Sequence, residues 1–420
     1  MMFYKETEFQ DTSIGKIPSD WQIIAIQKVC DLIRGTEPGS KSYNTKGRGY
    51  RFIRVSDLSK QILEPVFTNE NERRLIFCNR EDVLLALDGV PGVVNRGFEG
   101  AISSGIRILK PKTSNIIKDF LFQILQHGIV ERVIANHTTG TTIKHASRAI
   151  DFIKIPVPIF TEQEKIAHIL SVIDDTIVKT DKVIARTERL KKGLMQHLLT
   201  KGIGHKEYKD TLVGKTPKTW QTVKLGEVLN DIKYGTSVKA TSNGQGFPVL
   251  GIPNVLGGKI DKSSLRYVDL PESERRNLTL EDGDILLVRT NANPDYIGRC
   301  ALFENKRGTW LYASYLIRIR PDKQKVLPAY LVKFLQSERA RRQFLSIART
   351  SAGNYNINSQ GIRAVAVCMP SLPEQQKIAE ILSTIDNKLE LERNEKVRLE
   401  RVKRGLMDLL LTGKVRVKGD

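Results

Sequence analysis

The chain has 420 residues and a formal net charge of +20, with a hydrophobic fraction of 40%. This length allows two or three domains with cores of their own, and the composition is that of a globular protein. No apolar run is long enough to cross a bilayer and the first residues lack a signal-peptide pattern, so we expect a cytoplasmic protein without a membrane partner. The four cysteines stand far apart without C-x-x-C spacing, so neither a zinc site nor a disulfide framework is indicated.

The sequence repeats itself, and both copies open on the same predicted turn. Asp11–Gln22 matches Asp210–Gln221 at Asp, Thr, Gly, Lys, Pro, Trp and Gln. The apolar pattern then predicts three short strands, a helix, a polar loop and a last strand in each copy. These elements lie at 52–58, 82–87, 106–109, 120–135, 137–145 and 153–157, and again at 249–255, 284–288, 316–319, 329–347, 351–358 and 364–368.

Each copy ends in a predicted long helix, Thr161–Thr200 or Pro373–Thr412, and the two helices share EQxKIAxILSxID and GLMxxLLT. A Thr or Ser three residues before a Glu predicts a capping box at each start, from the pairs Thr161/Glu164 and Ser371/Glu374. The fold class is therefore α+β: two repeated mixed α/β domains separated by two long helices.

Apolar residues at heptad spacing predict that the two long helices pack against each other as an antiparallel coiled coil. The predicted interface residues are Ile166, Ile169, Ile173, Leu190 and Leu194 in the first helix, and Ile378, Ile381, Ile385, Leu399 and Leu406 in the second. Lys388, Glu392 and Glu395 occupy seam positions in the second helix, so we expect a weak centre there. This weak centre leaves open whether the helices pair within one chain or between two, and two ordinary core helices of a single domain are the alternative.

The positive charge lies outside the long helices. The first helix holds seven Lys or Arg and six Asp or Glu, and the second eight of each, so the pair carries +1 and the remaining residues +19. A basic globular part suggests a polyanionic partner, most often nucleic acid, although a merely soluble basic surface or an anionic membrane would also fit.

The motifs that suggest catalysis are incomplete. Gly214-Lys215-Thr216 resembles the end of a phosphate-binding loop, but Lys209 stands where that motif needs glycine. The segment 293–296, Asn-Pro-Asp-Tyr, differs from the Asn-Pro-Pro-Tyr loop of amino-methyltransferases at its second proline, and no Gly-rich loop for S-adenosylmethionine follows a strand. Residues 321–325 lack the separate acidic residue of a nuclease site, and the histidines have no metal-ligand spacing. We therefore expect neither a catalytic residue nor a metal site.

Polar loops at comparable points of both copies carry the side chains that contact phosphates and base edges. The predicted DNA-binding residues are Lys41, Tyr43, Lys46, Arg48 and Lys144 in the first copy, and Lys239, Arg289, Asn291, Asn293, Tyr296, Asn354 and Tyr355 in the second.

Over nearly its whole length, the chain resembles the specificity subunits of type I restriction-modification enzymes. The helix start EQxKIAxILSxID, the helix end GLMxxLLT, the P-x-x-W opening and the D-[VI]-L-L strand together carry the resemblance. It implies target-recognition domains at 1–158 and 204–370, spacer helices at 159–203 and 371–420, and a pseudo-twofold arrangement of the repeats.

The resemblance also implies a non-catalytic reader of double-stranded DNA, in which each recognition domain reads one half of a bipartite site. Two methyltransferase subunits would methylate adenine, two restriction and translocase subunits would complete the complex, and S-adenosylmethionine, Mg²⁺ and ATP would bind to these partners rather than to this chain.

The loops at 37–51 and 237–246 share almost nothing, which predicts two different half-sites and an asymmetric target. The alternatives are a stand-alone DNA-binding or regulatory protein, a scaffold without affinity for DNA, and an enzyme that acts alone.

Overall fold

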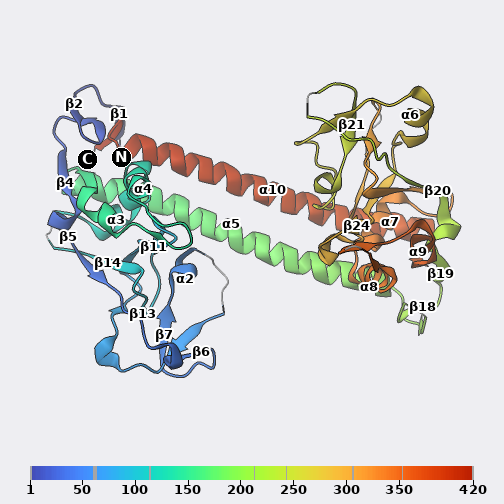
Figure 1. The fold of residues 1–420 in the computed structure, drawn as a ribbon, viewed down its shortest axis with the longest axis horizontal. Helices are drawn as coiled ribbons and strands as arrows, with labels where there is room; N and C mark the ends of the chain where they lie inside the picture. Colours follow the sequence, from blue (N-terminus) through green and yellow to red (C-terminus); the bar gives the residue numbers. More distant parts are fainter. Residues whose placement is uncertain are drawn as a thin grey trace. The chain divides into compact units, whose positions relative to one another are not determined.

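The computed structural model describes residues 2–59, 64–112, 115–211, 213–242, 244–304, 307–351 and 353–418. The chain forms two compact units, of which unit 1 comprises Met1–Lys182 and Asn394–Asp420, and unit 2 comprises Val183–Arg393. The long helices α5 (Phe160–Lys201) and α10 (Leu372–Leu410) each begin in one unit and end in the other (Figure 1). The domain boundaries near residues 158, 203 and 370 stay predictions.

In unit 1 a central sheet has the strand order β12-β10-β14-β5. Its strands are β12 (Val94–Asn95), β10 (Val83–Ala86), β14 (Ile106–Pro111) and β5 (Cys30–Arg34). A second sheet, in the order β6-β8-β7-β13-β9, consists of Tyr43–Asn44, Val66–Thr68, Tyr50–Ile53, Gly100–Ile102 and Phe77–Cys78. The helices α3 (Lys118–Leu125) and α4 (Gly128–Asn136) share a core with the central sheet, where Leu85 and Phe120 are fully buried.

Unit 2 repeats this construction, as the duplicated sequence predicts. Its central sheet has the order β20-β27-β23-β25, with strands Leu229–Tyr234, Leu316–Pro321, Ile285–Val288 and Cys300–Leu302. A smaller sheet, β22-β21-β26, consists of Arg266–Val268, Phe247–Leu250 and Leu311–Tyr312. The helices α7 (Pro328–Leu335) and α8 (Glu338–Ile347) close the core, and α6 (Glu272–Leu278) lies between β22 and β23 in the sequence.

Two predicted strands and two predicted helices are shorter than expected. The strand predicted at 52–58 stops at Ile53, because the Asp57 carboxylate accepts the backbone N–H of Arg54 and turns the chain into α2 (Val55–Ser59). Its counterpart at 249–255 stops at Leu250 before a 3-10 turn. The helix predicted at 120–135 divides into α3 and α4 where the His127 side chain caps α4, and the one at 329–347 divides where the Ser337 side chain caps α8.

The long helices pack antiparallel within one chain. In unit 1 the α5 residues Asp174 and Asp181 pair with Lys403 and Lys396 of α10, at 2.6 and 2.7 Å. In unit 2 Glu188 lies 2.6 Å from Arg393, and Lys191 lies 2.5 Å from Asp386. Partner numbers fall along α10 as they rise along α5, which is the antiparallel order.

The predicted seam is partly wrong. Ile166 and Ile378 are fully buried, but Leu190 is 53% exposed and Ile381 is 38% exposed. Thr187 and Leu389 are buried instead, so Leu389 fills the stretch of α10 for which the sequence predicted a weak centre. The reason is that a strict seven-residue repeat drifts around a straight helix of 3.6 residues per turn. The other predicted positions, Ile169, Ile173, Leu194, Ile385, Leu399 and Leu406, are half-buried.

The predicted capping boxes are wrong, because the acidic residues at the two helix starts serve other purposes. Helix α5 begins at Phe160, so Thr161 lies inside it, and Glu164 is exposed. At the start of α10 the Glu374 carboxylate accepts the indole N–H of Trp220 at 3.0 Å. In unit 1 Glu162 does the same for Trp21 at 3.2 Å. Each long helix is thus anchored to a tryptophan of the domain that precedes it.

The glutamine that follows each of these glutamates also anchors a domain. The Gln163 side chain accepts the backbone N–H of Ile117 at 3.0 Å and donates to the carbonyl of Asn115 at 2.7 Å. Gln375, its equivalent, accepts the N–H of Leu327 at 2.9 Å. The repeated Glu-Gln pair therefore fixes the loop that precedes α3 or α7 to the start of the following long helix.

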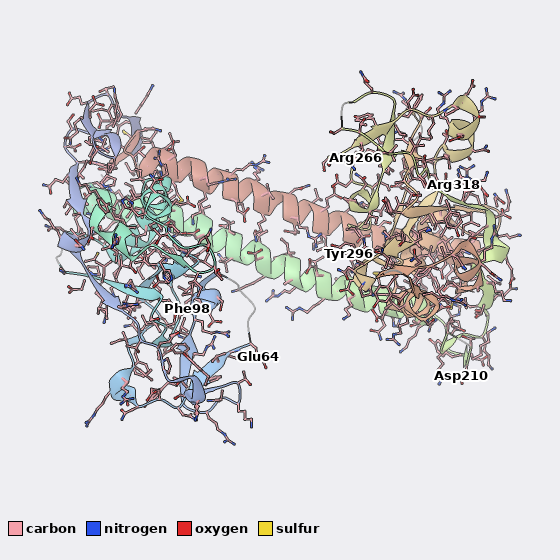
Figure 2. The ribbon with its side chains drawn as sticks, in the orientation of Figure 1. Glu64, Phe98, Asp210, Arg266, Tyr296 and Arg318 are labelled. Carbon is pink, nitrogen blue, oxygen red and sulfur yellow. The ribbon has the colours of Figure 1, made fainter. Side chains whose placement is uncertain are left out.

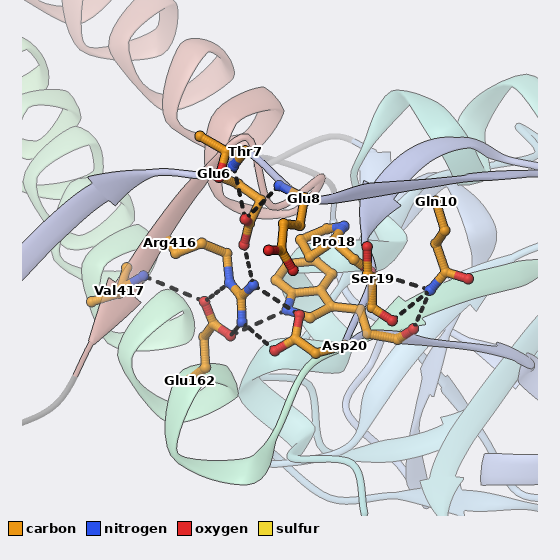
Figure 3. A network of polar contacts seen from close by, with 11 residues as sticks. Glu6, Thr7, Glu8, Gln10, Pro18, Ser19, Asp20, Glu162, Arg416 and Val417 are labelled. Atoms are coloured by element: carbon orange, nitrogen blue, oxygen red, sulfur yellow. Dashed lines mark hydrogen bonds and ion pairs between the residues drawn. The ribbon is translucent and has the colours of Figure 1, made fainter.

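In unit 1 the end of the chain completes the anchor (Figure 3). Strand β31 (Val415–Lys418) pairs antiparallel with β1 (Met2–Lys5) and carries Arg416, whose side chain is only 7% exposed. Its guanidinium donates to Glu6 at 2.5 Å, to both oxygens of Asp20 at 2.8 and 2.9 Å, and to both oxygens of Glu162 at 2.8 and 2.9 Å. One side chain joins the N-terminal strand region, the recognition domain and α5.

This cluster predicts that unit 1 loses stability in acid. A hydrogen bond from Arg416 lowers the pKa of Asp20, and a hydrogen bond from the backbone N–H of Glu8 is the main cause of the lowered pKa of Glu6. Because both pKa values are lower in the folded state, their stabilisation is complete above the unfolded values of about 4 and is lost as the pH falls through the folded values. We expect thermal unfolding of unit 1 to shift to lower temperature below about pH 4, with a weaker shift in Asp20→Asn. The same acid dependence in wild type and Asp20→Asn would contradict the assignment to Asp20.

Candidate nucleic-acid interface

One edge of the central sheet of unit 2 gathers several of the predicted DNA-binding residues. Strand β20 ends at Tyr234, opposite Ile317 of β27, and β23 ends at Val288, opposite Leu316. The C-terminal ends of β20 and β23 therefore lie at the same edge as the start of β27. Arg289 follows β23 directly at this edge.

A small sheet continues from this edge in the order β24-β29-β28, with strands Thr290–Asn291, Asn354–Asn356 and Arg349–Ser351. Asn291 lies opposite Tyr355, and the backbone N–H of Ile357 donates to the carbonyl of Arg289 at 2.8 Å. The structure thus brings Arg289, Asn291, Asn354 and Tyr355 together, although they come from two loops more than fifty residues apart in the sequence.

The next turn organises itself with its own asparagines. The Asn291 side-chain oxygen accepts the N–H of Asn293, and the Asn293 oxygen accepts the N–H of Asp295, at 2.8 and 2.9 Å. These bonds hold a 3-10 turn, Pro294–Tyr296, that presents Tyr296 with 37% of its surface exposed (Figure 2). Each amide oxygen accepts one of these hydrogen bonds, and the NH₂ group of each side chain can donate to DNA.

Lys239 lies in a segment that is fixed on both sides, since Thr236, three residues before it, bridges Ala313. It is exposed in the segment between β20 and β21, and the neighbouring Thr241 pairs with Tyr267 of β22.

In unit 1 the predicted residues form two groups. Lys41, Lys46 and Arg48 are exposed around β6, where the Asn44 side chain accepts the backbone N–H groups of Lys46 and Arg48 at 3.1 Å each. Lys144 lies on a different sheet, where β15 (Lys144–His145) pairs with β11 (Asp88–Gly89).

Tyr43 has a structural role in addition to its predicted one. It is half-buried against Phe52, with ring centroids 5.2 Å apart, and burial followed by the charge of Glu37 raises its pKa to about 12. The phenol is therefore neutral at physiological pH.

Sequence reasoning missed a buried arginine at the corresponding edge of unit 1. Arg107 is 4% exposed, and it donates to the carbonyl of Ser104 at 2.7 Å and to the hydroxyl of Ser147 at 3.0 Å. Burial and, secondarily, the charge of Arg34 lower its pKa. The available signal was a basic residue inside an otherwise apolar strand, Ile106–Leu109. Tyr234 and Tyr315 in unit 2 were missed as well.

Across the described residues, no group of three or more His, Cys, Asp or Glu is arranged to hold a metal ion. The four cysteines are buried and free, and burial raises the pKa of Cys78 to about 11 and those of Cys30 and Cys300 to about 12, so these thiols are poor nucleophiles. Within the same residues, every helix is too short or too polar to cross a bilayer.

Comparison with known proteins gives matches along both repeats. A family model described as the type I restriction modification DNA specificity domain matches residues 18–188 and 217–401. The chain is 32% identical to the type I restriction enzyme MjaVIII specificity subunit of Methanocaldococcus jannaschii, an alignment that covers 100% of this chain and 98% of that protein. It is 27% identical to the EcoKI specificity subunit of Escherichia coli K12, over 87% of this chain and 82% of that protein.

Solved structures share the fold. The S subunit of a type I restriction-modification system from M. genitalium superposes with a TM-score of 0.61 at 17% identity, over 93% of this chain and 96% of that one. A chain from a study of complex assembly in the type I restriction-modification system has a TM-score of 0.55 at 15% identity, over 95% of this chain and 99% of that one.

Proposed function

This chain belongs to the type I restriction-modification specificity family, and from that premise we propose that it is the non-catalytic DNA-reading subunit of a methyltransferase and endonuclease complex. Each recognition domain reads one half of a bipartite site in double-stranded DNA. The complex then directs adenine methylation or restriction to that site.

One observation supports this proposal most directly. The two units have equivalent central sheets, but the loops at the equivalent ends of these sheets carry different side chains. Both units present polar loops where the central strands end, and the loops at 37–51 and 237–246 differ almost completely. Different side chains on the same framework read different bases. The target is accordingly asymmetric.

The partners are two methyltransferase subunits and two restriction and translocase subunits, and the complex acts in the cytoplasm. S-adenosylmethionine, Mg²⁺ and ATP bind to those partners, and this chain supplies the DNA contacts. The proposed contacts are Lys41, Tyr43, Lys46, Arg48 and Lys144 in unit 1 and Lys239, Arg289, Asn291, Asn293, Tyr296, Asn354 and Tyr355 in unit 2.

The test is base-resolved methylation mapping of genomic DNA from cells that express this chain with and without type I methyltransferase subunits. We expect one asymmetric bipartite adenine motif that requires both the chain and the partners. Methylation by the chain alone would assign it an active site of its own. The absence of a motif, combined with tight binding of the isolated chain to one DNA sequence, would favour a stand-alone DNA-binding protein. Replacing the loop at 237–246 by the sequence of the loop at 37–51 should change the half-site that unit 2 reads. An unchanged motif would contradict base reading by this loop, and a wild-type motif with two equal half-sites would contradict the asymmetry.

A further inference from the structure

Two exposed tyrosines that the sequence did not single out flank Arg289 at the edge of the unit 2 sheet. Tyr234 ends β20 and is 41% exposed, and Tyr315 directly precedes β27 and is 58% exposed. The backbone N–H of Arg289 donates to the carbonyl of Tyr315 at 3.1 Å. The three residues are therefore neighbours on adjacent strands.

The Arg289 guanidinium lies over the ring of Tyr234, with its Cζ atom 4.8 Å from the ring centroid. This distance is within the range of a cation–π contact. The Tyr234 hydroxyl accepts the backbone N–H of Ser359 at 2.9 Å, which fixes the ring from its far end. The tyrosine thus provides a positioned support for the arginine.

The Arg289 guanidinium has N–H donors without hydrogen-bond partners among the described residues. Its Nε and Nη1 atoms are buried, and neither has a hydrogen-bond partner among the described residues. Buried donors without partners cost folding free energy, so a native structure that retains them commonly has a reason to do so. Because both atoms are buried, an acceptor from a bound molecule would satisfy them once the side chain rotates toward it.

The same edge of unit 1 is built from other residues. In unit 1 Arg34 lies opposite Arg107, and this pair corresponds to Tyr234 opposite Ile317 in unit 2. The same strand register makes Leu87 the equivalent of Arg289, and Gly105 the equivalent of Tyr315. Leu87 is fully buried, and Arg34 donates its Nε proton to the carbonyl of Ser104 at 3.2 Å. The tyrosine-supported arginine is therefore a feature of unit 2 and distinguishes its edge from that of unit 1.

We propose that Tyr234 and Arg289, with Tyr315 beside them, form a donor site for the acceptor atoms of DNA in the half-site that unit 2 reads. Arginine binds the O6 and N7 acceptors of guanine or the oxygens of a phosphate, and the two sources share this chemistry. The inference rests on the proposed function and adds Tyr234 and Tyr315 to the residues that determine specificity.

The experiment uses the full chain with methyltransferase subunits and compares the methylation motifs of wild type, Arg289→Leu, Arg289→Lys, Tyr234→Ala and Tyr234→Phe. Leucine is the residue that unit 1 has at this position, so Arg289→Leu tests the difference between the units. The control is Arg276→Leu, because Arg276 is an exposed residue of α6 that pairs with the exposed Glu272.

If Arg289 reads a base, Arg289→Leu lowers discrimination at one base pair of one half-site by about tenfold to a hundredfold and leaves the other half-site unchanged. If it binds a phosphate, affinity for all duplexes falls and the slope of log affinity against log salt decreases by about 1. Arg289→Lys retains part of the phosphate effect but loses base discrimination, and Tyr234→Ala reduces either effect more than Tyr234→Phe does.

An unchanged motif and unchanged salt slope in both Arg289→Leu and Tyr234→Ala would overturn the inference while leaving the proposed function intact. Failure of the wild-type complex to methylate a bipartite motif would instead overturn the proposed function. In that case the affinity of the full chain for mixed-sequence duplex still tests Arg289, and equal affinities of wild type and Arg289→Leu would overturn the inference. Thermal unfolding at the wild-type temperature shows that a variant is folded.

Discussion

Replacing Arg416 by alanine is expected to lower the free energy of unfolding of unit 1 by about 3–5 kcal/mol, the usual cost of removing one partner from a buried charge cluster. Among the residues that the structure describes, the substitution would leave the Glu162 carboxylate, whose side chain is 4% exposed, with the Trp21 indole and the backbone N–H of Val417 as its donors. Glu6, whose side chain is 11% exposed, would lose its charged partner and keep the backbone N–H groups of Thr7 and Glu8 as donors.

Hydrogen exchange resolved along the chain provides the measurement, because it separates the two units. We expect protection to fall in β1, β31 and the start of α5, while the sheet of unit 2 keeps its wild-type protection. Arg398→Ala is the matched control, since Arg398 lies on α10 in unit 1, its side chain is 77% exposed, and it pairs with the partly exposed Glu395. Equal protection in Arg416→Ala and Arg398→Ala would show that the cluster contributes no more than a surface pair.

Replacing Asp386 by alanine is expected to lower the free energy of unfolding of unit 2 by a similar amount, about 3–5 kcal/mol. Asp386 of α10 accepts hydrogen bonds from Lys333 of α7 and Lys191 of α5, and the Lys333 side chain is only 11% exposed. Although burial raises the pKa of Asp386, the hydrogen bonds from Lys191 and Lys333 together lower it below its usual value. The substitution would leave a buried ammonium group without an anion.

The duplicated structure supplies the control for this prediction. In unit 1 the equivalent Asp174 accepts a neutral hydrogen bond from Gln123 at 2.8 Å and pairs with Lys403 at 2.6 Å. Asp174→Ala should cost less, about 1–3 kcal/mol, because Gln123 is neutral and Lys403, which is 16% exposed, keeps the side-chain oxygen of Gln126 as an acceptor. The double variant Asp386→Ala, Lys333→Gln should recover much of the loss. Equal losses for the two aspartates in denaturant unfolding would show that the buried charge is not the cause.

The architecture was predictable because the sequence contains two copies of the same pattern of strands and helices. Matching apolar runs located β10 and β23, β14 and β27, and the shared EQxKIAxILSxID start located α5 and α10 to within two residues. Periodicity within one segment carries that information. It could not show that Glu162 and Glu374 bind tryptophans, because those partners lie 141 and 154 residues away in the sequence.

The candidate site was predictable only in part, for a related reason. The polar loops identified Arg289, Asn291 and Tyr355 from the sequence. Tyr234 ends a strand, and its place beside Arg289 follows only from the register of β20, β27 and β23. Lys144, chosen for the same loop composition, lies on a different sheet from Lys41, Lys46 and Arg48. Composition finds polar loops, and strand pairing decides which of them meet.

The pairing of β1 with β31 has a consequence for the order in which the chain folds during synthesis. Unit 2 is one continuous segment, Val183–Arg393, and all of it has been translated before Asn394 is added. Unit 1 needs its last segment, in which Arg416 reaches Glu6 across a separation of 410 residues. Contacts this distant in sequence form slowly, because a long loop must close before they stabilise anything. Unit 1, whose first residues leave the ribosome first, is therefore expected to fold after unit 2. A chain truncated before Arg416 would have a folded unit 2 and an incompletely folded unit 1.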